Sequence, residues 1–186
     1  MNTHARRDGE FSATEMNRLL DLVSTKLAAR GVSAVVYVVG GAAIALQHDE
    51  RRTTDDIDGL AVPRRDVLAA AREVARDEGL REDWLSTAAQ PWIPAPTIKV
   101  EPGATPGLAV ELAPPEHLLA MKLIARRGAR DMNDILILAR ALDVSRAEDL
   151  RKIVVAAYGE EMIESVHGGL HNLLLDCQVV ERRLTE

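Results

Sequence analysis

The sequence predicts an α/β (α+β) fold, in which a core built on a mixed sheet is followed by a helical part. Two apolar segments, AVVYVV at 34–39 and IDGLAV at 57–62, have the β-branched content and the alternation of strands. After Ala113 the apolar residues recur at helical spacing, and no further strand pattern follows. We therefore expect a sheet core over residues 1–113 and a helical region over residues 114–186.

Composition limits the classes of protein to which the chain can belong. Its 186 residues fit one domain with a helical extension, and 47% of them are hydrophobic, which is enough for a core. The net charge of −6 argues against a general nucleic-acid coat protein, but it is compatible with a local basic cleft. A single cysteine and no apolar run near the roughly 18 residues of a membrane span predict a cytoplasmic protein.

The elements of the first half are bounded by capping residues and glycines. Ser12 followed by Glu15 is the spacing of a capping box, and it predicts a helix that runs to about Arg30 and stops at Gly31. Pro63 and Gly79 likewise bound a later helix. The elements expected after the first helix are a strand at 34–39, a short helix at 40–47, a strand at 57–62 and a helix at 64–78.

In the middle and at the end of the chain, prolines, glycines and capping residues predict where the elements begin and end. Trp and Pro residues make 82–97 irregular, and a strand at 98–101 is expected to form a hairpin with a strand at 108–113. Ser145 and Glu148 predict a second capping box. The expected helices are 115–127, 130–142, 145–158 and 160–184, the last weakened at Gly168-Gly169.

The first candidate site combines two glycines with two carboxylates. Gly40 and Gly41 join a strand to a helix start, where backbone amides attract phosphate. Asp56 and Asp58 flank the start of the next strand at spacing i, i+2, so they share one face and suit a divalent cation. The simpler alternative is a tight turn beside two solvated acids. Glu111 is the one good candidate for a third metal carboxylate.

A second candidate site follows from a predicted helical hairpin. Lys122 lies six residues before Gly128, and Asp134 lies six after it, so the two residues face each other if the helices fold back at Gly128. Asp131 and Asp134 are one turn apart on the same face. Lys122 could then meet a triphosphate while an acid orients it or acts as base. The alternative is an ordinary salt bridge between the helices.

These motifs resemble those of a known family. Gly-Gly followed by the segment from Arg52 to Asp58, RTTDDID, resembles the signature of the polymerase-β-like nucleotidyltransferase superfamily. The segment from Lys122 to Ile135 resembles the pattern of the AbiEii/MenT-type nucleotidyltransferase toxins, with its Lys, Arg and Asp at Lys122, Arg126, Arg130, Asp131 and Asp134. The chain departs from the superfamily at Gly41, where a serine that contacts phosphate is common, and in its longer spacer before Asp56.

The resemblance implies a nucleotidyltransferase fold whose helical region completes the active site. It implies transfer of a nucleoside monophosphate from an NTP, with CTP or another pyrimidine NTP as a candidate. Asp56 and Asp58, with Glu111, would hold Mg²⁺, and Lys122 and Asp134 would act in catalysis. The implied nucleotide-binding residues are Gly40, Gly41, Arg52, Thr53, Thr54 and Lys122, with Asp131, Arg126 and Arg130 as secondary candidates.

The resemblance also implies partners. The acceptor would be RNA, at the 3′ end of tRNA, and a cognate antitoxin would restrain the enzyme, whereas no membrane or DNA partner is expected. A basic rim is predicted to attract RNA to the cleft; its residues are Arg51, Arg52, Arg64, Arg65, Arg126, Arg127 and Arg130. Two alternatives stay open: an aminoglycoside-type small-molecule nucleotidyltransferase, and a non-catalytic relative that binds a nucleotide or a partner.

The C-terminal histidines and the cysteine carry weaker signals. His167 and His171 are spaced i, i+4, but they lack the acid of a zinc protease, so a surface pair is expected. Cys177 has no partner motif and is expected to be a small buried apolar residue.

Overall fold

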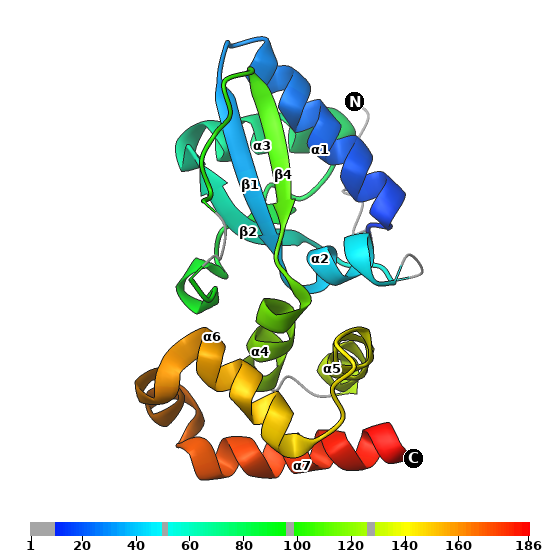
Figure 1. Ribbon diagram of the computed structural model, residues 1–186. Helices are drawn as coiled ribbons and strands as arrows, with labels where there is room; N and C mark the ends of the chain where they lie inside the picture. The colour runs from blue at the N-terminus through cyan, green and yellow to red at the C-terminus, as the bar shows by residue number, and fades with distance from the viewer. Residues whose placement is uncertain (1–9, 50–51, 96–98, 126–128) are drawn as a thin grey trace. The chain divides into compact units, whose positions relative to one another are not determined.

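The structure, a computed structural model, describes residues 10–49, 52–95, 99–125 and 129–186, and the side chains of 129 and 130 lie outside this description. Helices and a mixed sheet together give the predicted α+β class (Figure 1). Within the described ranges, no helix has the length and apolar character needed to cross a bilayer. The described chain divides into two compact units: one runs to Pro91 and includes the residues from 99 to Leu112, and the other comprises Trp92–Ala95 and Ala113–Glu186.

A four-stranded sheet with the order β3-β2-β1-β4 forms the centre of the first unit. The predicted strands appear as β1 (Ser33–Val39), β2 (Ile57–Val62) and β4 (Gly107–Leu112). β2 pairs antiparallel with β1, and β4 pairs parallel with β1. The short β3 (Leu85–Ser86) pairs parallel with β2, inside a stretch that was predicted to be irregular. β1 is therefore the central strand, which explains why its run from Ala34 to Val39 is buried throughout.

Three helices accompany this sheet: α1 (Ala13–Ala28), α2 (Gly40–Gln47) and α3 (Arg64–Glu78). α1 runs alongside β4, and α3 lies behind the strands in Figure 1. A short 3₁₀ turn, η1, covers Gln90–Trp92. The ends of α2 and α3 agree with the sequence prediction, and α3 stops at Gly79, whose φ of 70° is the left-handed conformation of a C-cap glycine.

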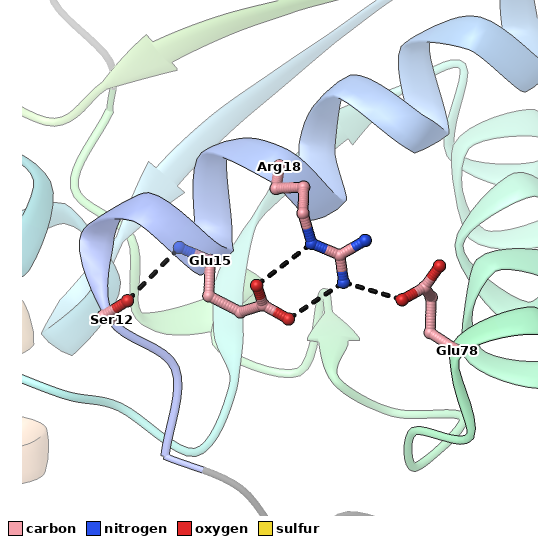
Figure 2. A network of polar contacts seen from close by, with 4 residues as sticks. All are labelled: Ser12, Glu15, Arg18 and Glu78. Carbon is pink, nitrogen blue, oxygen red and sulfur yellow. Dashed lines mark hydrogen bonds and ion pairs between the residues drawn. The ribbon is translucent and has the colours of Figure 1, made fainter.

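The predicted cap of α1 forms, and it is linked to α3. Ser12 Oγ accepts a hydrogen bond from the backbone N–H of Glu15 at 3.3 Å (Figure 2). The Glu15 carboxylate accepts from Arg18 at 2.9 and 3.0 Å. Arg18 also donates to Glu78, in the last turn of α3, at 2.7 Å (Figure 2). The capping segment therefore fixes both the start of α1 and its contact with the end of α3.

The predicted hairpin between a strand at 98–101 and the strand at 108–113 is wrong. Ile98 lies outside the described residues, and 99–101 form no strand. β4 instead pairs with β1, and the backbone N–H of Leu108 donates to Ser24 Oγ of α1 at 2.9 Å. The backbone N–H of Leu108, which a hairpin partner would need as a donor, is therefore bound to Ser24 of α1.

The second unit is helical, as predicted, and contains α4 (Pro115–Ala125), α5 (Ala129–Ala141), α6 (Ala147–His167) and α7 (Leu170–Thr185). α4 packs against the other three helices, so most of its surface is apolar. Gly159, with φ 75°, interrupts α6 where the sequence predicts a boundary, and Gly168 ends it in the left-handed conformation. The second predicted capping box does not form. The N-cap residue of α6 is Arg146, which makes no side-chain cap, and Ser145 lies outside the helix.

Candidate functional site

The register of two strands brings the glycine turn and the aspartate pair together. Asp58 is the cross-strand partner of Val39, the last residue of β1. Gly40, with φ 64°, follows Val39 and starts α2 with Gly41. A left-handed φ at this point favours glycine, because a side chain would be strained there. The N-terminus of α2 and the start of β2 therefore lie at the same end of neighbouring strands.

Asp56 and Asp58 interact electrostatically. Asp56 is exposed and directly precedes β2, whereas Asp58 is half-buried within it. Partial desolvation of the carboxyl raises the pKa of Asp56 above its ordinary value, and the negative charges of Asp58 and Asp55 raise it further. The two carboxylates stand two residues apart, one just before β2 and one within it. Two nearby carboxylates with mutual repulsion are a natural site for a cation.

Arg52 and Thr54 lie over the glycine turn. Arg52 Nε donates to the carbonyl oxygen of Gly41 at 3.2 Å. A Cβ atom added to Gly41 would lie 3.0 Å from Arg52 Nη2 and 3.1 Å from Thr54 Oγ1. The guanidinium and the hydroxyl therefore occupy the space that a larger residue 41 would need. A side chain at position 41 would need Arg52 and Thr54 to shift by a few tenths of an ångström.

Thr53 binds Glu10, and Glu111 lies on a different strand from the aspartates. Thr53 Oγ1 donates to Glu10 Oε2 at 2.7 Å. Glu111 pairs in register with Tyr37, so it shares a sheet face with Asp58 but lies two strands from it, roughly 10 Å away at the usual strand spacing. In the part of the chain that the structure describes, no three His, Cys, Asp or Glu side chains gather into a metal-binding group. The structure thus brings Asp56 and Asp58 together without Glu111.

Lys122 forms an ion cluster with both predicted acids of α5. Its Nζ atom lies 2.6 Å from Asp131 Oδ1 and 2.9 Å from Asp134 Oδ2. The exposed fractions of the three side chains are 16%, 8% and 0% for Lys122, Asp131 and Asp134. The predicted helical hairpin therefore forms the salt bridge that was the alternative to phosphate binding. These three residues belong to the second unit, whereas Asp56 and Asp58 belong to the first.

The described side chains of the predicted rim are those of Arg52, Arg64 and Arg65. Arg64 and Arg65 begin α3 after the end of β2. The side chain of Arg64 donates to Thr87 at 2.9 Å, and Thr87 directly follows Ser86, the register partner of Asp58. Arg52 does lie at the glycine turn. The other predicted members lie outside the described side chains: Arg51, Arg126, Arg127 and Arg130. The guanidinium of Arg64 is therefore held beside the strand that pairs with the start of β2, and the basic rim stays a prediction.

The sequence did not predict the Arg81–Asp83 pair near the aspartates or the contact between Glu10 and Thr53. Arg81 and Asp83 exert opposite electrostatic effects on Asp56, and they also bind each other through two hydrogen bonds of 2.7 and 3.0 Å. Glu10, which precedes the predicted capping box, contacts Thr53. The parallel pairing of β3 with β2, which no local pattern predicts, is what brings residues 81–83 to the start of β2.

The second unit holds a further cavity and a buried histidine. The cavity has a volume of about 520 Å³, and its mostly apolar wall comes from α4, α5 and α7. His167 is 8% exposed, and its Nε2 lies 2.7 Å from Asp176, so the predicted surface pair is wrong for His167. Cys177 is buried as predicted, and burial raises the pKa of its thiol to about 12. Such a thiol is unreactive at neutral pH.

Comparison with known proteins assigns no family to the chain. The chain matches no family model, no curated protein and no solved structure.

Proposed function

We propose that the chain is a cytoplasmic Mg²⁺-dependent nucleotidyltransferase, which transfers a nucleoside monophosphate from an NTP to RNA and releases pyrophosphate. Following the resemblance of its motifs, the acceptor is the 3′ end of tRNA, and the protein is the toxin of a toxin–antitoxin pair. The observation that carries the proposed reaction is the register of β1 and β2. The register sets Asp58 opposite Val39. The two carboxylates and the N-terminus of α2, which begins at Gly40, therefore lie at the same end of β1 and β2.

The aspartate pair fits a divalent cation. Carboxylate oxygens are the ligands that Mg²⁺ prefers. Partial desolvation, and then the charges of Asp58 and Asp55, raise the pKa of Asp56, and a bound cation would favour its ionised form. Asp56 and Asp58 would hold the ion. Bound Mg²⁺ would neutralise charge on a triphosphate and act as a Lewis acid on its phosphoryl oxygens.

The remaining residues would bind and orient the nucleotide. Backbone amides at Gly40 and Gly41 would donate to phosphate oxygens at the start of α2. Arg52 and the Thr54 hydroxyl, which both lie over Gly41, would add a charge and a hydrogen bond at the same turn. The resemblance assigns Lys122 to the triphosphate and Asp134 to orienting it, and a role for Lys122 would require that its ion pairs with Asp131 and Asp134 rearrange.

One observation favours a second candidate, transfer to a cationic small molecule of the aminoglycoside type. Of the charged groups that act on Asp56, three are acids, Asp55, Asp58 and Asp83, and one is basic, Arg81. An acidic neighbourhood attracts a polycation and repels a polyanion.

A labelling experiment separates these candidates. The protein is incubated with Mg²⁺ and each α-labelled NTP, with total RNA, with a panel of aminoglycosides, or with neither, and Asp56→Asn serves as the matched control. Label in tRNA that depends on Asp56 and falls steeply with salt supports the RNA acceptor. Label in an aminoglycoside alone supports the second candidate. No label in any arm, with NTP binding retained, would leave the non-catalytic alternative and refute the enzyme.

A further inference from the structure

The two residues before the cap of α1 lie against the segment that leads to Asp56. The Phe11 N–H donates to the Thr54 carbonyl at 2.6 Å, and the Thr54 N–H donates to the Phe11 carbonyl at 3.1 Å. This reciprocal pair is an isolated antiparallel bridge. One residue earlier, Glu10 Oε2 accepts a hydrogen bond from the Thr53 hydroxyl at 2.7 Å. Three hydrogen bonds thus join residues 10–11 to residues 53–54.

The Phe11 end of this bridge is firmly anchored. The Phe11 side chain is 5% exposed, and its ring meets that of Trp84 edge-on, with 6.2 Å between centroids. Trp84 is 1% exposed and donates through Nε1 to the carbonyl of Ala71 in α3. Ser12, the next residue after Phe11, caps α1. The bridge is therefore held between the core and the start of a helix, so it is a rigid support for residues 53–54.

Residues 52–54 carry the groups that meet the glycine turn. Between the end of α2 and the start of β2, the described residues form no helix or strand except for this bridge. Arg52 reaches Gly41 from this segment, and Asp56 follows two residues after Thr54. Because the segment has no ladder of its own, contacts with residues 10–11 are well placed to set its position.

We propose that Glu10 and Phe11 form a clamp, defined by these three hydrogen bonds, which positions residues 52–56 for metal and nucleotide binding. The proposal rests on the proposed function, and it adds positioning residues that touch neither the metal nor the nucleotide. Glu10 is exposed, so changing it tests the clamp without removing core packing. Phe11 contributes to the core and is left intact.

The test compares Glu10→Ala with Glu10→Gln, since a glutamine amide oxygen still accepts from the Thr53 hydroxyl. Glu101→Ala removes another exposed carboxylate of the same unit, whose partner is Lys99, and serves as the matched control. The first readout is the rate of tryptic cleavage after Arg52 in the protein without ligand. The second is the affinity for Mn²⁺ in the presence of an NTP, measured by the Mn²⁺ electron spin resonance signal.

Glu10→Ala should be cleaved about two- to tenfold faster and bind Mn²⁺ about two- to tenfold more weakly, the effect of losing one hydrogen bond. Glu10→Gln and Glu101→Ala should match the wild type in both readouts. Thr53→Val should show the same effects, and combining it with Glu10→Ala should add nothing, since both remove one interaction.

Unchanged cleavage in Glu10→Ala, or faster cleavage with unchanged Mn²⁺ affinity, would refute the clamp while leaving the proposed function intact. A wild-type protein that binds neither Mn²⁺ nor any NTP would refute the proposed function, and the positioning role with it. The two failures are therefore distinguishable.

Discussion

Asp58 lies directly across the antiparallel β1–β2 pair from Val39, and Val39 is the last residue before the Gly40-Gly41 turn. A shift of this register by one residue would move the Asp58 carboxylate to the other face of the sheet. The register is held by the buried residues of β2, Ile57 and Ala61, which alternate with half-buried neighbours. Core packing along β2 therefore also determines the position of the proposed metal ligands.

Replacing either aspartate should abolish nucleotide transfer while preserving the fold. Asp56→Asn and Asp58→Asn each remove a charged metal ligand, so activity should fall by about a hundredfold or more. Neither residue is in the core, so circular dichroism and the unfolding midpoint should stay close to the wild type. Asp55→Asn, a change of the same kind at an exposed neighbouring position, should retain activity within a few-fold. Full activity in Asp56→Asn would refute the metal-binding assignment.

The raised pKa of Asp56 makes stability depend on pH in a defined direction. The native carboxyl holds its proton more tightly than the unfolded one, whose pKa is near 3.8, so the stabilisation from protonation is complete below that value. It is lost as pH rises through the native pKa. Asp56→Asn lacks this ionisation, and its thermal midpoint at pH 7 should exceed that of the wild type by about 1–2 °C, since the group is exposed and screened. The difference should shrink towards pH 4, and a lower midpoint in Asp56→Asn at pH 7 would contradict the electrostatic account.

Gly59 should tolerate no side chain, because the backbone of β1 is too close. A Cβ atom at Gly59 would lie 2.4 Å from the carbonyl oxygen of Tyr37, whereas one at Gly103 would meet nothing within 4 Å. Gly59→Ala should therefore destabilise the protein by about 1–3 kcal/mol or more, and lower the unfolding midpoint by several degrees. Gly103→Ala is the control and should leave the midpoint unchanged. Equal midpoints for the two variants in thermal unfolding would show that the β1–β2 contact is looser than described.

The two predicted capping boxes should differ in their contribution to stability. Ser12 accepts a hydrogen bond from the backbone N–H of Glu15, whereas Ser145 lies outside α6 and provides no cap. Ser12→Ala should cost about 1 kcal/mol, or a few degrees in the unfolding midpoint, and Ser145→Ala should cost almost nothing. Chemical denaturation of both variants measures the difference. A larger loss in Ser145→Ala than in Ser12→Ala would contradict the capping assignment.

Local patterns predicted the elements whose ends are marked by capping residues or glycines. The bounds of α2, β2 and α3 follow from Gly40, Pro63 and Gly79, each of which acts through its own backbone conformation. The same local logic predicted that Lys122 and Asp134 would meet, because a helical hairpin relates residues at equal distances from its turn.

Long-range pairing was not predictable in this way. The parallel partner of β1 lies far along the chain in β4, and apolar alternation does not specify a partner, so a hairpin with 98–101 was expected instead. The contact between Glu10 and Thr53 depends on the bridge at Phe11, and one exposed carboxylate in a polar segment carries no signal of it.

The ion cluster of Lys122 changes what its replacement should do. From the sequence alone, Lys122 was expected to meet a triphosphate, with a salt bridge between the helices as the alternative. In the structure its Nζ lies 2.6 Å from Asp131 and 2.9 Å from Asp134, whose side chain is fully buried. Lys122→Met leaves two buried carboxylates without this cation, so it should destabilise the second unit by about 3–5 kcal/mol.

A charge-neutral variant separates the structural role of Lys122 from a catalytic one. The triple variant Lys122→Met, Asp131→Asn, Asp134→Asn removes all three charges, so it should recover much of the stability lost in Lys122→Met. Both variants are assayed for nucleotide transfer at a temperature at which circular dichroism shows them folded. If Lys122 or Asp134 acts in the reaction, the triple variant should be stable and inactive. If the triple variant is stable and fully active, the cluster serves only to join α4 to α5, and the role of Lys122 in the reaction is refuted.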